Sequence, residues 1–273
     1  MGFESYRYYS SLQLLVAGIW VHRGYHLPLP DGLPPEYEFL EEEDFAIVYP
    51  KGFDIERFVS ELRKARAWLE QIFGLCRRGA IHGIVYREED SPRWGVGFTL
   101  PAGIFGVVFH PSFSSNIIKT GIHELIHIFI LDHDIQTKLD TFSPYWNIKE
   151  DEKYWLRRDI EEALAAALEA KYLKEPIEFF TRQRLSLRGE LKERSDPTLL
   201  AGMLILAEKT TKAPILQVTS QLLEVIINAK SKKDAREMIA QFFVSLLPRK
   251  FRKFLTEEHI AHGTWKYTVQ PEG

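Results

Sequence analysis

The 273-residue sequence is long enough for one large domain or two smaller ones, and 45% hydrophobic with 27% charged residues is ordinary for a globular protein. A net charge of −3 gives no reason to expect nucleic acid or an anionic membrane as a partner. The single cysteine, Cys76, excludes a disulfide within the chain and a zinc site built from cysteines, so a metal would be held by His, Asp or Glu.

The first apolar stretch is SLQLLVAGIW, residues 11–20. It is short for a membrane-spanning helix and lacks the basic flank and the small-residue cleavage site of a signal peptide. We therefore expect a buried helix or strand here, and a cytoplasmic protein. Residues 22–44 are rich in proline and acidic side chains, which favours a loop or linker.

A helix and several strands are predicted next. FAIVY, residues 45–49, is a short apolar run typical of a strand. Residues 53–74 carry apolar side chains at helical spacing, and Gly74 is expected to close that helix. Turn-like segments separate three further apolar runs, which predict a small antiparallel or mixed sheet: IHGIVY (81–86), WGVGFTL (94–100) and IFGVVFH (104–110).

The remainder of the chain is predicted to be mainly helical. A helix capped by Ser114 or Ser115 carries the sequence GIHELIHIFI (121–130). Residues 131–147 are expected to form a loop, and residues 150–173 form an alanine-rich helix suited to close packing. Further helices are predicted over residues 175–190, 197–210, 214–229, 232–247 and 249–259.

This order of elements predicts an α+β protein with two parts. Residues 1–174 would form one domain, which includes the N-terminal segment 1–44, and residues 175–273 a helical C-terminal subdomain.

His123, Glu124 and His127 match the pattern H-E-x-x-H on the helix that follows the predicted sheet. Histidines four residues apart lie about 40° apart around a helix axis, so both can bind one Zn²⁺ ion. Glu124 lies one position along and can reach a water on the metal without binding the metal itself. It is therefore the candidate general base of a zinc hydrolase.

A catalytic zinc ion usually takes three protein ligands, and His133 is one candidate for the third. It follows His123 by ten residues, which is the spacing of the metzincin metallopeptidases. Ile130 stands where that family has a glycine, and a β-branched residue resists the sharp turn that the glycine permits. Met203 and Met238 lie inside predicted helices, so neither fits the methionine turn of that family.

The other candidate is a glutamate on the helix at residues 150–173. The stretch EEALAAALE (161–169) resembles the second motif of the gluzincins, the metallopeptidases that complete H-E-x-x-H with a glutamate. This resemblance, which covers residues 110–173, implies Glu162 as the third ligand. Glu161 is the alternative if the register differs by one residue.

The resemblance implies a zincin-like fold and a zinc-dependent peptidase that acts on a peptide or protein substrate. In that fold an edge strand before the active-site helix binds extended substrate, and GIFGVVF (103–109) is the candidate strand. Whether the activity is that of an endopeptidase or an aminopeptidase stays open. A non-catalytic binding or regulatory protein that retains the metal site is the alternative from another functional class.

A donor that stabilises the oxyanion is usual in such sites. No single residue is assigned to this role, and four candidates are available: Tyr145, Tyr154, His259 and His262.

Overall fold

The computed structural model describes residues 15–16, 19, 32–90, 97–100, 103–109, 114–143, 152–175 and 197–247. The chain divides into two compact units, Met1–Leu131 and Asp132–Gly273. The domain boundary expected after residue 174 lies inside the second unit and stays a prediction. Together the described elements make an α+β protein, as expected.

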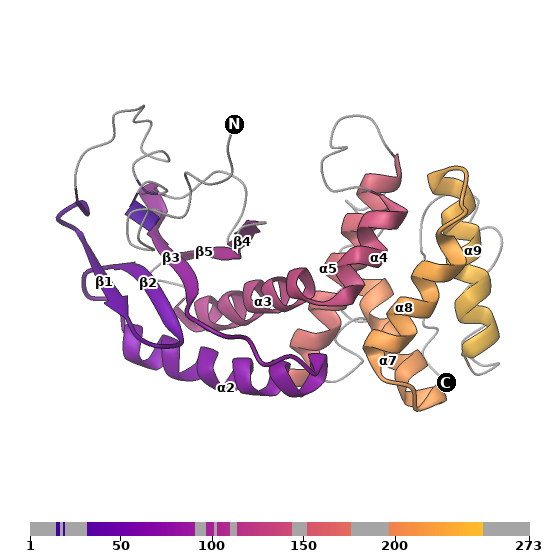
Figure 1. Cartoon of the computed structure of the whole chain (residues 1–273), viewed down its shortest axis with the longest axis horizontal. Helices are drawn as coiled ribbons and strands as arrows, with labels where there is room; N and C mark the ends of the chain where they lie inside the picture. The colour runs from indigo at the N-terminus through magenta and orange to yellow at the C-terminus, as the bar shows by residue number, and fades with distance from the viewer. Residues whose placement is uncertain are drawn as a thin grey trace, which may run out of the picture. The chain divides into compact units, whose positions relative to one another are not determined.

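The first unit contains a five-stranded mixed sheet (Figure 1). In chain order its strands are β1 (Tyr37–Glu41), β2 (Phe45–Pro50), β3 (Ile81–Arg87), β4 (Gly97–Leu100) and β5 (Ile104–Phe109). Across the sheet their order is β1-β2-β3-β5-β4. β2, β3 and β5 are parallel, and the outer strands β1 and β4 are antiparallel to their neighbours.

Strand β1 corrects the prediction of a loop over residues 22–44. Its sequence YEFLE places Tyr37 and Phe39 on one face and Glu38 and Glu41 at exposed positions. Tyr37 is buried, and its hydroxyl donates a hydrogen bond of 2.8 Å to Asp90. The two aromatic residues provide the alternation that an edge strand needs, whereas the surrounding prolines and acids hide it in the sequence.

The edge strand next to the helix that carries the H-E-x-x-H sequence is β4, which corrects a second prediction. β5 contains most of the GIFGVVF segment, yet it lies inside the sheet between β3 and β4. Both backbone edges of β5 are therefore paired, and it has no free edge for an added strand.

One face of the sheet packs on the helix α2 (Ile55–Phe73). Phe105 of β5 lies with its ring centroid 6.5 Å from that of Phe58 on α2. The ring of Phe105 also covers Gly83 on β3, where a Cβ atom would lie only 2.3 Å from the ring. Glycine at this position leaves the space that the aromatic ring occupies.

The opposite face of the sheet has its own apolar cluster. Val48, Ile84 and Tyr86 of the sheet pack there with Leu15 and Ile19 from the N-terminal stretch. Leu15 and Ile19 are helical and fully buried, which confirms the expected burial of this apolar stretch at the residues that the structure describes.

Helix α2 begins and ends as the sequence indicates. The carboxylate of Asp54 accepts a hydrogen bond from the backbone N–H of Arg57 and caps the first turn. Gly74 closes the helix in the left-handed conformation, with φ of 63°. Four of the residues at helical spacing form its buried stripe: Phe58, Leu62, Ala65 and Leu69.

Helix α3 (Ser114–Asp132) follows the sheet, on the same side as α2 (Figure 1). Its apolar side packs at Gly121, where a Cβ atom would lie 2.8 Å from the ring of Phe58 on α2. Ile122, Leu125 and Ile126 are buried. This packing fixes the helix that carries the H-E-x-x-H sequence.

The second unit is helical in the residues that are described. α4 (Asp134–Phe142) packs on α8 (Ile215–Ile226), and α5 (Glu152–Tyr172) packs on α7 (Pro197–Thr211). α9 (Lys232–Leu246) contacts α7 and α8. The helices predicted at residues 175–190 and 249–259 lie outside the described residues.

Helix α4 corrects the prediction of a loop over residues 131–147. Ile135, Leu139 and Phe142 are buried at helical spacing on one face of α4. The Nδ1 atom of His133 accepts a hydrogen bond of 3.1 Å from the backbone N–H of Ile135 and caps the helix. A histidine cap is less common than serine, threonine, aspartate or asparagine, so the start of this helix was easily missed.

None of the described helices combines the length and the apolar character that crossing a membrane requires.

Candidate metal centre

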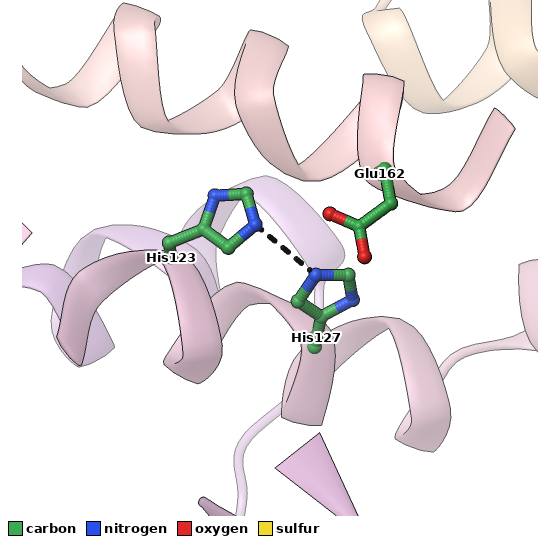
Figure 2. A group of neighbouring side chains, drawn as sticks. All are labelled: His123, His127 and Glu162. Carbon is green, nitrogen blue, oxygen red and sulfur yellow. Dashed lines mark hydrogen bonds between the residues drawn. The ribbon is translucent and has the colours of Figure 1, made fainter. Parts of the chain in front are cut away.

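The two histidines of the motif lie one turn apart on α3 with their rings adjacent. Their Nε2 atoms are 3.2 Å apart, at hydrogen-bonding distance (Figure 2). His127 is 7% exposed and His123 is half-buried. The helix backbone brings both nitrogens to one point, as the four-residue spacing predicts.

This separation fits a shared metal ion. Two nitrogens bound to a tetrahedral zinc ion at 2.0–2.1 Å are expected to lie about 3.3 Å apart. The observed 3.2 Å between the Nε2 atoms is close to that value. Neutral imidazole can present a lone pair at Nε2, so both rings can serve as ligands without a change in helix geometry.

Glu162 comes from α5 and is half-buried. His123, His127 and Glu162 each offer one ligand atom, and these atoms lie within 4.8 Å of one another (Figure 2). Two imidazole nitrogens and a carboxylate oxygen suit zinc and also other divalent transition metals. The donor set therefore fits a catalytic zinc site without being specific to zinc.

Glu161, the alternative ligand, has a different partner. Its carboxylate accepts a 2.7 Å hydrogen bond from Nη1 of Arg157, one turn earlier on α5. Nη2 of Arg157 donates a second bond, of 3.1 Å, to Asp140 on α4. Arg157 is only 1% exposed, so these two carboxylates offset the cost of burying its positive charge.

Glu124, the candidate base, is 6% exposed on α3. Its carboxylate contacts the edge strand β4, where Oγ1 of Thr99 donates a 2.8 Å hydrogen bond to Oε2. The backbone of Gly97 lies against the other oxygen, since a Cβ atom at residue 97 would be 2.6 Å from Oε1. The carboxylate is thus buried with a hydrogen-bonding partner.

Sequence reasoning missed Thr99 and Gly97. The available signal was the two-residue period of WGVGFTL, which places residues 97 and 99 on one face and Phe98 on the other. That period alone does not show which helix the face meets.

His133 caps α4 through Nδ1 and does not belong to the group of ligand atoms formed by the other three residues. Burial lowers the pKa of His133, and the nearby Asp134 carboxylate opposes that shift. The neutral form that burial favours is the form whose Nδ1 can accept the capping hydrogen bond.

The described residues do not support any of the four candidates for an oxyanion donor. Tyr145, His259 and His262 lie outside the described residues. Tyr154 is described on α5, where it is half-buried.

A separate cavity of about 340 Å³ lies at the start of α2 and α3. Phe53, Phe58, Phe109 and Ile117 supply its apolar lining, and Arg57 lies at the same cavity. Neither the histidines nor Glu124 line it, so this cavity is not part of the candidate metal centre.

The chain matches no protein-family model, no curated protein and no solved structure.

Proposed function

We propose that the protein is a zinc-dependent peptidase with a zincin-like catalytic region of the gluzincin type. The observation that carries this proposal is the convergence of both histidine Nε2 atoms beside the Glu162 carboxylate. In this proposal His123, His127 and Glu162 hold the metal, and Glu124 is the general base.

The proposed chemistry is hydrolysis of a peptide bond. A bound zinc ion would lower the pKa of a coordinated water and polarise the scissile carbonyl. The Glu124 carboxylate accepts a proton from the attacking water and then delivers it to the leaving amine. Because Glu124 is buried, few bulk water molecules compete for its oxygens.

We propose that an extended substrate binds along the edge strand β4. It pairs with β5 on one side, and among the described residues no strand pairs with its other side. A peptide added along that edge would lie next to the strand that contacts Glu124. This arrangement would bring a scissile bond close to the base.

The test compares wild type with Glu124→Gln. Metal analysis of both proteins should find about one zinc ion per chain, since Glu124 is not a ligand. Cleavage of a denatured protein or a peptide library should fall by about 10²–10⁴-fold in the variant, because the base is lost. Glu56→Gln, on an exposed residue of α2, is the matched control and should keep wild-type activity.

Each alternative predicts a different outcome. Stoichiometric zinc without cleavage of any substrate would favour a non-catalytic binding or regulatory protein. Loss of zinc in His133→Ala, with zinc retained in Glu162→Ala, would instead favour the metzincin-like ligand set.

A further inference from the structure

The edge strand β4 lies directly against the carboxylate that we propose as the base. Oγ1 of Thr99 is 2.8 Å from Oε2 of Glu124 and 3.0 Å from the backbone carbonyl oxygen of the same residue. A hydroxyl group has a single proton to donate, so the two acceptors share it. A carboxylate is the stronger acceptor when it is ionised, which favours the shorter contact.

The second carboxylate oxygen is confined by backbone. A Cβ atom at residue 97 would lie 2.6 Å from Oε1 of Glu124 and 2.6 Å from Cγ2 of Thr120. Real side chains do not approach so closely, so the carboxylate occupies space that only a glycine at residue 97 leaves open. One oxygen of Glu124 is therefore held by a hydrogen bond and the other by close packing.

The sheet in turn holds the strand that makes these contacts. Gly97 pairs with Val107 and Thr99 with Phe105 in the antiparallel ladder between β4 and β5. Phe98 points to the opposite face, where its ring lies over Gly106. The Thr99 hydroxyl thus reaches Glu124 from a strand whose position is set by its neighbours.

We propose that Thr99 is a positioning residue for Glu124, and that residue 97 must remain glycine to leave room for the carboxylate. The inference rests on the proposed function, in which Glu124 acts as the base. A carboxylate that is held in the reactive orientation lowers the barrier of the chemical step. A side chain without this hydrogen bond samples several rotamers and occupies that orientation less often. Loss of the hydroxyl should therefore slow the chemical step and leave substrate binding intact.

The kinetic test uses Thr99→Val, which keeps the shape of the side chain and removes the donor. We expect kcat to fall by about 10- to 100-fold, with KM within about twofold of wild type and the zinc content unchanged. Thr99→Ser keeps the hydroxyl and should recover most of kcat. Gly97→Ala should lower kcat by a similar factor, because its Cβ atom displaces the carboxylate.

The matched control is Thr141→Val, on an exposed threonine of α4, which should leave both constants unchanged. Equal kcat in Thr99→Val and wild type would overturn the positioning role while Glu124→Gln still tests the proposed function. A loss that Thr99→Ser does not recover would also overturn it, because the hydroxyl would then not be the important group.

A second measurement does not depend on a substrate. Thr99→Val should lower the thermal unfolding midpoint of the full-length chain by about 3–8 °C, because it leaves a buried carboxylate without this donor. In the Glu124→Ala background the same substitution should lower the midpoint by less than half as much. Equal shifts in the two backgrounds would overturn the contact itself, whether or not any peptide is cleaved.

Discussion

Two adjacent glutamates on α5 have different surroundings. Glu161 is bound to Arg157, a side chain that is almost fully buried and that also bonds to Asp140. Glu162 offers its carboxylate beside the two histidines. A one-residue step along a helix turns a side chain by about 100°, which is enough to separate the ion pair of Glu161 from the metal-binding role that we propose for Glu162.

This difference predicts opposite effects for two neighbouring substitutions. Glu162→Ala should weaken zinc binding by more than about 100-fold, since loss of a ligand exceeds the usual effect of an outer partner. Glu161→Ala should keep the zinc but lower the free energy of unfolding by about 2–3 kcal/mol, because the buried Arg157 guanidinium loses its 2.7 Å bond to the Glu161 carboxylate.

Equilibrium dialysis against zinc and urea unfolding of the metal-free chain measure the two quantities. The two variants serve as controls for each other, because they remove the same chemical group. Zinc loss in Glu161→Ala with full retention in Glu162→Ala would move the ligand by one residue and contradict our assignment.

At this scale the sequence predicts the local part of the site and little beyond it. The relation between His123 and His127 follows from helical spacing alone. The partner of Glu124 does not, because Thr99 is distant in the sequence and meets it only through strand pairing.

Close approach of two helices sets the position of α3. At Gly121 the backbone of α3 lies against Phe58, which is 1% exposed and also touches Phe53 and Phe105. A side chain at residue 121 would have to displace that ring. We therefore expect an added methyl group at residue 121 to overpack the contact between α3 and α2.

Gly121→Ala should therefore lower the free energy of unfolding by about 1–3 kcal/mol through overpacking, less about 1 kcal/mol gained in helix propensity. Chemical denaturation of the purified chain measures the net effect. The double variant Gly121→Ala/Phe58→Leu should lose less stability than the two single changes added together, because the smaller side chain relieves the clash. Simple additivity would contradict the proposed contact.

The helices could be predicted from the sequence where their apolar spacing repeats over several turns. The helices α2, α3 and α5 have several turns of regular apolar spacing, and the structure confirms them. β1 and α4 are short. Prolines and acidic residues flank β1, and a histidine caps α4, so both segments resemble loops in composition. Short elements gain their stability from tertiary packing, so local sequence identifies them poorly.

At the scale of the whole molecule, the free energy of unfolding should depend on the zinc concentration if the proposed site binds zinc. A ligand that binds only the folded state stabilises it by about 2.7 kcal/mol at 100 times its Kd. The His123, His127 and Glu162 donors exist as a group only in the folded chain. Binding should therefore be linked to folding.

Zinc at that concentration should raise the thermal midpoint of the metal-free chain by about 5–10 °C, and chelation should reverse the rise. Differential scanning calorimetry measures it. Mg²⁺ should have a smaller effect, because it prefers an all-oxygen octahedral shell. An equal rise in His123→Ala would show that the stabilising zinc ion binds elsewhere.

The sequence by itself determined the α+β class, the long helices and the pairing of two histidines with a glutamate on one helix. These features depend on spacings of a few residues, which covalent geometry and helical periodicity control. Only the tertiary structure decided that β4 is the edge strand, that Arg157 engages Glu161 and that Thr99 meets Glu124. The physical reason is that strand order and side-chain partners depend on how distant segments pack, and hydrophobic periodicity carries no record of that arrangement.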